Sequence, residues 1–331
     1  MQRGVRPAAS LFSGITPVNN PRILALFTIL LWSFGAYLTR LIALRSQFLL
    51  LALAFLFAFL TLLVVNVIQH RGFSFLNRAH LRLGFLLLGP LGYFVYSVSY
   101  NQSSRAYNSI SETTILNYTW PVFTILFTDL VFNKKSHRSG LFRTVEAAGI
   151  LIGFASIVIL ATRGNPASFQ INLPGIFWGL VTGLSYGIFS AYSSTIDEDR
   201  QGVFLLTATL ASLVFITGFA LGELGLLKTL TLKDVAVAFA LGGLLDGIGY
   251  TTWTRANRLA HQQQVDISSI ASLMLVLPFT SLLIVSLLLG ENQIVQPYFI
   301  ASLALILVSS IICQKTETIV GWIKQEGKHK I

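Results

Sequence analysis

The sequence predicts an all-α membrane protein: ten transmembrane helices in two five-helix halves of opposite orientation, a 5+5 inverted-topology repeat. Three observations predict this fold class. Hydrophobic residues make up 54% of the 331-residue chain and charged residues only 11%, whereas soluble domains carry roughly 25% charged residues. Ten apolar segments are each long enough to cross a bilayer. A stretch of the first half is similar to a stretch of the second.

The composition excludes several kinds of function. The single cysteine, Cys313, rules out a disulfide framework and a cysteine-based metal site. The five histidines are dispersed, and no phosphate-binding loop of the GxxxxGK[ST] type occurs. We therefore expect no metal, no cofactor and no enzymatic activity. The net charge of +10 fits the lysine and arginine excess on the cytoplasmic side of membrane proteins, so we expect lipid, not nucleic acid, as a partner.

The ten expected spans follow one another through short connections. Residues 1–22 are polar and basic and are predicted to form a disordered tail. The first apolar run is too long for a signal-peptide core, so we expect a retained span. Residues 315–331 are predicted to be a basic cytoplasmic tail. The spans are expected at 23–42, 47–68, 82–100, 111–132, 144–162, 174–194, 203–221, 234–254, 267–289 and 295–313.

The basic residues predict the orientation of these spans. If the N-terminus is cytoplasmic, seventeen of the 23 lysines and arginines fall in cytoplasmic segments and six in outer segments. This bias agrees with the positive-inside rule. We therefore expect a multi-pass protein of the cytoplasmic (inner) membrane with both termini in the cytoplasm. The six outer residues are Arg40, Arg45, Arg105, Arg163, Lys228 and Lys233.

An internal repeat predicts the two halves. A shift of 157 positions lays residues 92–132 over residues 249–289 without a gap. The halves are then 23–163 and 174–314, with five spans each. Because five is odd, the second half enters the membrane from the opposite face, as in secondary transporters that bind cargo near the midplane. The matched residues are Gly92 with Gly249, Tyr93 with Tyr250, Tyr96 with Trp253 and Pro121 with Pro278.

Two prolines are expected to bend matched spans. Pro121 cannot donate to the carbonyl of Asn117, and Pro278 cannot donate to that of Met274. In lipid such carbonyls must meet protein or water. We expect both bends to lie beside a shared interior and to act in gating. The alternative is that the prolines only shape helix packing.

Three segments carry a family resemblance. ETTILNYTWPVFTILF (112–127), LWSFGAYLTR (31–40) and GIGYTTW (247–253) resemble the EamA-like branch of the drug/metabolite transporter superfamily, and within it the bacterial aromatic amino acid exporters. The resemblance covers about residues 22–314. It implies efflux of amino acids or related metabolites through a central cavity. The cargo-binding residues that it implies are Trp32, Asn117, Tyr118, Trp120, Tyr250 and Trp253.

Two acidic residues are candidates for coupling or gating. Asp246 lies inside a span, where a charge is costly and usually faces a cavity or a partner. Removal from water favours the protonated carboxyl group, which makes Asp246 a candidate proton carrier. The exporters have an apolar residue at this position. Glu112 begins the fourth span, where it acts as a gate or complements the helix dipole; Arg40 and Arg105 are its candidate partners.

The sequence thus favours a secondary transporter that exports small organic metabolites, with amino acids as the leading class, driven by an ion gradient, such as that of protons, or by the cargo's own gradient. Three alternatives are open. The chain is an importer, drug carrier or nucleotide-sugar carrier of the same fold; a membrane-embedded enzyme, which needs histidines and acids gathered at one depth; or a scaffold with a solid interior. The sequence does not give the oligomeric state.

Overall fold

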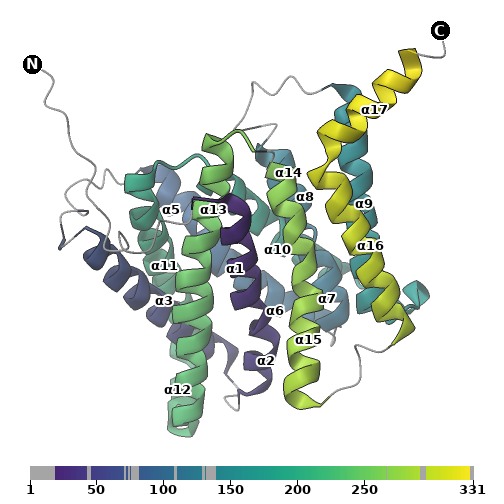
Figure 1. Ribbon diagram of the computed structural model, residues 1–331. Helices are drawn as coiled ribbons and strands as arrows, with labels where there is room; N and C mark the ends of the chain where they lie inside the picture. The colour runs from purple at the N-terminus through teal and green to yellow at the C-terminus, as the bar shows by residue number, and fades with distance from the viewer. Residues whose placement is uncertain are drawn as a thin grey trace, which may run out of the picture.

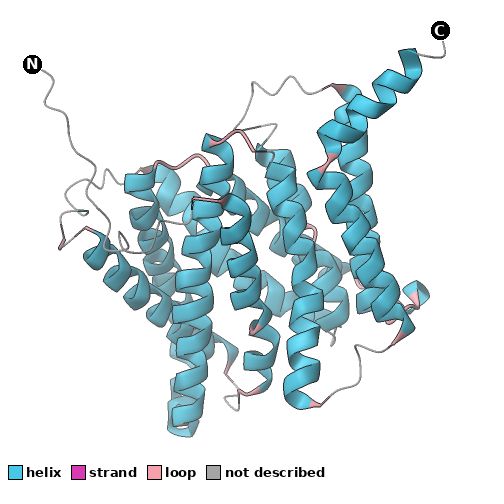
Figure 2. Ribbon diagram, in the orientation of Figure 1, coloured by secondary structure: helices cyan, strands magenta, loops and turns pink. Residues whose placement is uncertain are grey.

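The structure is a computed structural model that describes residues 19–42, 46–70, 72–73, 75, 82–107, 110–128, 131, 139–265, 267–290 and 296–328. Within these ranges the chain is helical with short loops and no strand (Figure 2). The helices form one bundle, with α17 projecting from it (Figure 1). The prediction of an all-α chain is confirmed for this part of the sequence.

The helices of the first half are α1 (Pro21–Ser33), α2 (Gly35–Arg40), α3 (Gln47–Gln69), α5 (Leu83–Pro90), the π-helix η1 (Leu91–Val95), α6 (Tyr96–Tyr107), α7 (Ile110–Asn117), α8 (Trp120–Phe127) and α9 (Gly140–Ala161). A short 3-10 turn, η3 (Pro166–Ser168), follows. Apolar side chains dominate these helices because lipid is their solvent on the outer face.

The helices of the second half are α10 (Leu173–Ser193), α11 (Glu198–Ala220), the 3-10 helix η4 (Leu221–Thr229), α12 (Leu232–Phe239), the π-helix η5 (Ala240–Gly249), α13 (Tyr250–Gln262), α14 (Ile267–Ala271), the 3-10 helix η6 (Ser272–Val276), α15 (Leu277–Leu289), α16 (Pro297–Gln314) and α17 (Thr316–Lys328). A capping box between Thr231 and Asp234 starts α12.

Nine continuous helices in the described part of the chain are long and apolar enough to cross a membrane. They correspond to nine of the ten expected spans. The fourth expected span, 111–132, is divided between α7 and α8, each of eight residues, so neither half reaches a spanning length. The chain is therefore a multi-pass membrane protein with nine such helices described, and a tenth crossing stays a prediction.

Pro121 explains the break between α7 and α8. Tyr118 and Thr119 form a turn, and Pro121 occupies the first turn of α8, where a missing backbone N–H costs nothing. The break lies against α10: a Cβ on Gly183 would meet the Thr119 hydroxyl at 2.1 Å and the Leu116 carbonyl at 3.1 Å. A glycine is thus required where α10 crosses the turn.

The expected bend at Pro278 also has a structural counterpart. The preceding turn, η6, is a 3-10 helix, and α15 begins at Leu277. The backbone N–H of Leu277 donates to the carbonyl of Met274. This is the carbonyl to which Pro278, which has no N–H, cannot donate. Tightening to 3-10 geometry thus satisfies the carbonyl group inside the protein.

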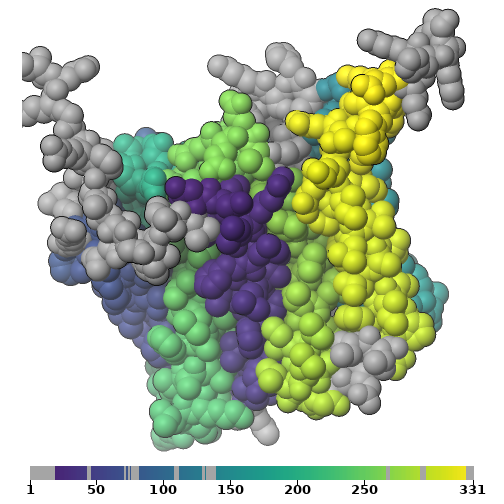
Figure 3. Space-filling model, viewed as in Figure 1, coloured from purple at the N-terminus to yellow at the C-terminus, as the bar shows by residue number. Residues whose placement is uncertain are grey.

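The helices pack crosswise between the two halves. The first helix, α1, lies against α13 and α15, and Figure 3 shows it on the surface between α12 and α15. The first helix of the second half, α10, packs against α6, α7 and α8. In addition, α3 packs against α11 and η5, α11 packs against α5, and α9 pairs with α16.

Small residues allow this close packing. Glycines at every fourth position of α10 face α6, α7 and α8, so that a Cβ on Gly179 would meet Leu116 at 2.5 Å and one on Gly187 would meet Phe123 at 2.4 Å. In η5, a Cβ on Gly242 would lie 1.9 Å from the carbonyl oxygen of Ala54 in α3. These helices are held at backbone distance, where association in lipid depends on van der Waals contact.

The predicted tails are partly described. Residues 1–18 and 329–331 lie outside the described residues, so the predicted disorder of the N-terminal tail is not tested. Pro21 already belongs to α1. The predicted C-terminal tail contains α17, in which Val320 is buried while Trp322 and Ile323 are exposed. An exposed apolar face beside basic residues is typical of a helix at the membrane surface.

Candidate functional site

Aromatic side chains from both halves meet in the middle of the bundle. The indole of Trp32 on α1 lies edge-on to Tyr250, with ring centroids 5.6 Å apart, and 6.3 Å from Trp253. Trp253 on α13 lies edge-on to Trp120 at 5.5 Å. The structure thus brings together four of the six predicted cargo-binding residues. We call them, with Tyr93, Tyr96 and Tyr186, the aromatic cluster.

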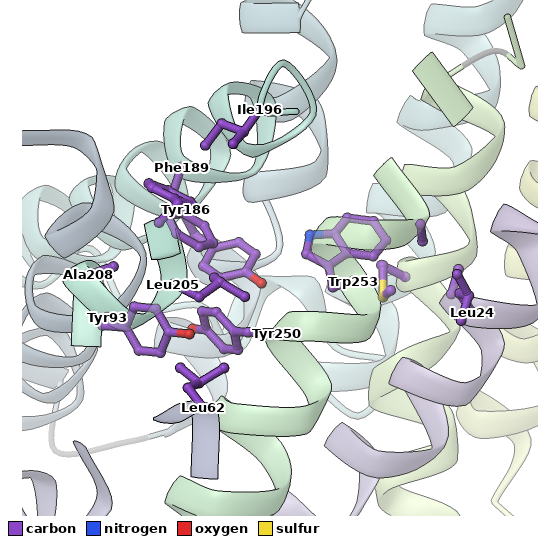
Figure 4. Close-up of a cluster of buried hydrophobic side chains, with 14 of the residues drawn as sticks. Leu24, Leu62, Tyr93, Tyr186, Phe189, Ile196, Leu205, Ala208, Tyr250 and Trp253 are labelled. Carbon is purple, nitrogen blue, oxygen red and sulfur yellow. The ribbon is translucent and has the colours of Figure 1, made fainter. Parts of the chain in front are cut away.

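Tyr93 and Tyr250 form the centre of the aromatic cluster. Their rings stack with centroids 4.3 Å apart (Figure 4). The Tyr93 hydroxyl donates to the backbone carbonyl of Asp246 at 3.1 Å, and the Tyr250 hydroxyl donates to the carbonyl of Gly92 at 2.8 Å. Each tyrosine therefore binds the backbone of a π-helical segment in the other half, where carbonyl groups are less regularly paired.

Tyr186 on α10 completes one side of the aromatic cluster. Its ring lies 5.6 Å from Tyr250, 5.1 Å from Tyr96 and 5.0 Å from Trp120. Edge-to-face pairs at these distances are favourable contacts between aromatic rings. The Trp253 indole N–H donates to the Ser190 hydroxyl at 2.9 Å. Trp253 is fully buried, so in this conformation it packs within the protein.

Asp246 lies on η5 beside the aromatic cluster. The span that contains it runs from Leu232 to Gln262, so Asp246 is one residue from its middle. The side chain is half-buried. The preceding carbonyl, that of Leu245, accepts a hydrogen bond from the Trp32 indole at 3.0 Å. A carboxyl group at this depth fits the expectation that it faces a partner or an internal space.

Four phenol groups lie within electrostatic range of the Asp246 carboxyl group: those of Tyr93, Tyr96, Tyr186 and Tyr250. They come from η1, α6, α10 and α13. Among the residues that the structure describes, none donates a hydrogen bond to this carboxylate or forms an ion pair with it. Its surroundings are therefore rings and hydroxyls without a counter-charge.

At the end of α7, the side chains of Asn117 and Tyr118 lie in different parts of the protein interior. Asn117 is buried, its amide bonds the Tyr96 hydroxyl, and its Oδ1 has no hydrogen-bond partner among the described residues. Tyr118 instead packs in a second hydrophobic cluster with Ile157 and Phe279. The turn at 118–119 thus points these neighbours in different directions, and Tyr118 is not in the aromatic cluster.

Glu112 lies away from the aromatic cluster. It is buried in the first turn of α7, and its Oε2 has no hydrogen-bond partner among the described residues. Its carboxyl group interacts electrostatically with Tyr107, which packs against α10. Arg105, one of its expected partners, is exposed and lies over the Phe48 ring at 5.8 Å. A gating role of Glu112 stays a prediction.

The two prolines differ in burial. Pro121 is buried beside Trp120 in α8, and Pro278 is half-buried in α15. Next to Pro278, Thr280 shares a hydrogen bond with Ser33 of α1, and Ser281 donates to the Ser33 carbonyl at 3.0 Å. Both proline-containing helices therefore contact the protein interior, whereas gating by them stays a prediction.

An ion pair near one end of the bundle was not anticipated from the sequence. Arg258 on α13 lies 3.0 Å from Glu198 at the start of α11. The arginine side chain is 3% exposed and the glutamate 74%. The acidic start of α11 and the basic turn of α13 were visible in the sequence, but nothing in it placed them together. The pair links two helices at the end where α13 terminates.

No group of three metal-binding side chains occurs among the described residues. The described polar groups around the aromatic cluster include its phenols, the Ser190 hydroxyl, the amides of Asn117 and Asn257 and the carboxyl group of Asp246. Such a set offers hydrogen-bond acceptors and aromatic faces for a small molecule. It does not form a nucleophile–base pair of the kind that hydrolytic enzymes use.

No family model matches the chain. Over 174 residues it is 25% identical to a protein of Acidianus ambivalens described as "Uncharacterized transporter in sor 3'region". That match covers 52% of this chain and 64% of the relative, so it spans less than two thirds of the relative's length. The similarity to a transporter agrees with the expectation that the chain is not an enzyme.

A solved structure shares the fold. It is described as "Crystal structure of protein" and superposes with a TM-score of 0.68, covering 88% of this chain and 95% of its own, at 20% sequence identity. Together with the apolar helices, the similarity to the Acidianus ambivalens protein indicates a transporter-like, multi-pass membrane protein.

Proposed function

We propose that the protein is a secondary active transporter that exports amino acids or related small organic metabolites across the cytoplasmic membrane by alternating access. Its two halves, 23–163 and 174–314, are an inverted repeat of the EamA-like type in this proposal. The reciprocal binding of Tyr93 and Tyr250 is the observation that carries it. They are matched positions of the repeat, and each donates to the backbone of the opposite half.

The crosswise packing supports the inverted repeat. The first span, α1, packs on the eighth and ninth spans, which contain α13 and α15. The sixth span, α10, packs on the third and fourth spans, which contain α6, α7 and α8. Spans two and seven pair with each other, and so do spans five and ten. A two-fold axis in the membrane plane generates this pattern, because it exchanges each helix with its equivalent.

The local irregularities support the same symmetry. α8 begins at Trp120 and α15 at Leu277, which are 157 positions apart, with a proline in second place in each. Of the two matched tyrosines, Tyr93 lies within the π-helix η1, and Tyr250 directly follows the π-helix η5. Gly92 packs on Phe189 of α10, and Gly249 packs on Trp32 of α1, so each matched glycine faces the first helix of the other half.

The ends of the bundle support a tenth crossing by α7 and α8 together. α1 begins and α16 ends at the same end of the bundle (Figure 1), and Gln263 at the end of α13 donates to the Asn19 carbonyl beside the start of α1. An even number of crossings returns the chain to its starting face. Nine long helices plus the α7–α8 pair make ten. The excess of basic residues would place this face in the cytoplasm.

Transport is tested by flux measurements on purified protein in liposomes. We expect saturable movement of a labelled amino acid or related metabolite, accelerated by unlabelled cargo on the opposite side, because exchange is a property of alternating access. Liposomes without protein are the control. A difference between inside-out and right-side-out preparations distinguishes export from import. Absence of flux for every amino acid, drug and nucleotide sugar tested would support a scaffold instead.

Proton coupling is proposed to use Asp246. The phenols of Tyr93, Tyr96, Tyr186 and Tyr250 within its electrostatic range ordinarily titrate near pH 10, so the carboxyl group is the member of this set proposed to exchange protons between pH 5 and 8. We expect wild-type transport at saturating cargo to vary with pH in this range. The residual transport of Asp246→Asn should be independent of pH.

The matched control for proton coupling is Asp199→Asn, which removes the same charge from an exposed site on α11. Its pH profile should follow the wild type. If Asp246→Asn kept the wild-type profile, Asp246 would not be the coupling group.

A further inference from the structure

We propose that the cargo carries an ammonium group, and that Asp246 together with the faces of Trp32, Tyr186 and Tyr250 is the binding site for that cation. This inference rests on the proposed transport function and names the class of its substrate. The carboxyl group in question, that of Asp246, is not among the cargo-binding residues that the family resemblance implies.

The carboxylate of Asp246 lacks a counter-charge. A carboxylate near the middle of a membrane-spanning segment is costly and is usually paired. This one has neither a hydrogen-bond donor nor an ion-pair partner among the described residues. The described ion pair, Arg258–Glu198, lies at the end of α13, about three turns away along the helix. A cationic ligand would supply the charge that the protein leaves out.

Aromatic residues lie next to this carboxylate: the phenols of Tyr186 and Tyr250 are within its electrostatic range, and the Trp32 indole binds the carbonyl of the preceding residue, Leu245. Trp32, Tyr186 and Tyr250 contact one another edge to face, with centroid separations of 5.6 to 6.1 Å. Three mutually inclined rings beside a carboxylate are the arrangement that recognises organic ammonium ions, because the ring faces are electron-rich and attract cations. Trp32 is half-buried rather than sealed in the core, as is Asp246, so both have surface left for a ligand.

The balance of donors and acceptors favours the same kind of ligand. In the layer of the aromatic cluster, Asn117 Oδ1 and the Tyr186 hydroxyl are buried without a partner, and Tyr96 interacts with both Asn117 and Asp246. The Asn117 oxygen and the Asp246 carboxylate only accept hydrogen bonds, and the Tyr186 hydroxyl can accept one as well as donate. At the end of the bundle near Glu198, by contrast, Arg255 and Gln201 have buried nitrogen atoms without a hydrogen-bond partner, while Arg258 pairs with Glu198. A cargo with N–H donors complements the central layer, whereas an anion does not.

The carboxylate, the rings and the free acceptors define a substrate class: a small organic molecule with an amine that is protonated at neutral pH and an apolar or aromatic body. A zwitterionic amino acid belongs to the class through its ammonium group. A simple carboxylic acid does not, because its charge would repel that of Asp246.

The test is a charge series on one carbon skeleton. Purified wild-type protein is titrated by calorimetry and thermal unfolding with phenethylammonium, phenethyl alcohol and phenylacetate at pH 7. We expect the cation to bind and raise the melting temperature, since a ligand of the folded state stabilises it. The alcohol should bind at least tenfold more weakly and the anion not measurably. This comparison needs no variant, so it holds even if a variant does not fold.

The binding group is then assigned with two variants. Asp246→Asn should weaken phenethylammonium binding at least tenfold and leave the weak binding of the alcohol unchanged. Asp199→Asn, the exposed control, should bind the cation as the wild type does. Equal cation binding by Asp246→Asn would overturn the assignment to Asp246.

Failure of this inference is distinguishable from failure of the proposed function. Tighter binding of phenylacetate or phenethyl alcohol than of the cation would overturn the inference on substrate class. If liposome flux of a neutral or anionic metabolite were then found, the proposed transport function would stand while the inference falls. If no compound moved across the membrane, the proposed function itself would fail.

Discussion

Replacing Gly242 by alanine should strongly destabilise the protein, because the added methyl group has no room. The new Cβ would lie 1.9 Å from the carbonyl oxygen of Ala54 and 2.7 Å from its Cα. Both atoms belong to the backbone of α3, so no side-chain rotation relieves the overlap and the two helices must separate. Overpacking of this kind costs about 1–3 kcal/mol or more.

The matched control for this substitution is Gly218→Ala on α11, where nothing lies within 4 Å of the added Cβ. Alanine in place of glycine inside a helix is otherwise favourable by about 1 kcal/mol. The two substitutions should therefore have opposite signs in thermal unfolding of the detergent-purified protein: a lower melting temperature for Gly242→Ala and an equal or higher one for Gly218→Ala. Equal melting temperatures would show that α3 and η5 are not in backbone contact.

Trp253→Ala should give the second large effect. The side chain is fully buried, it contacts Trp32 and Trp120, and its indole N–H bonds Ser190. Truncation would leave a cavity between the two halves and remove one of the two hydrogen bonds that the Ser190 hydroxyl accepts. In soluble proteins, large-to-small changes of buried tryptophan cost about 3–5 kcal/mol. We expect a marked loss of folded protein in size-exclusion and thermal unfolding measurements.

Two further variants serve as controls for Trp253→Ala. Trp253→Phe keeps most of the ring and should lower the melting temperature much less than alanine does. Trp322→Ala removes a tryptophan that is 62% exposed on α17 and should change little. A wild-type melting temperature for Trp253→Ala would contradict its placement in the core.

The positions of nine spans could be predicted from the sequence because lipid imposes a length and a hydrophobicity on any helix that crosses it. The fourth span shows the limit of that rule. Its apolar run is long enough, and Pro121 indicated a bend. The hydropathy does not reveal that the helix ends at Asn117 and restarts at Trp120, because hydropathy is averaged over the span and does not register a two-residue turn.

The site was predictable to a similar degree. Trp32, Trp120, Tyr250 and Trp253 were expected together, and the structure places them within contact of one another. Tyr118 was expected with them but packs near α9 and α16, because its direction is decided by a two-residue turn rather than by helical periodicity. The contacts of Tyr93 and Tyr186 within the aromatic cluster are visible only in the tertiary structure, since aromatic residues at helical spacing occur in packing as well as in binding sites.

The stacked pair Tyr93–Tyr250 has a consequence for motion. In a molecule whose halves are related by a two-fold axis, two equivalent side chains that touch each other must lie on that axis. When one half rocks against the other, points on the axis are displaced least and helix ends most. The phenol pair would then serve as a pivot: in the proposed cycle its two hydroxyl bonds persist, while contacts at the helix ends, such as Gln263–Asn19, break and re-form.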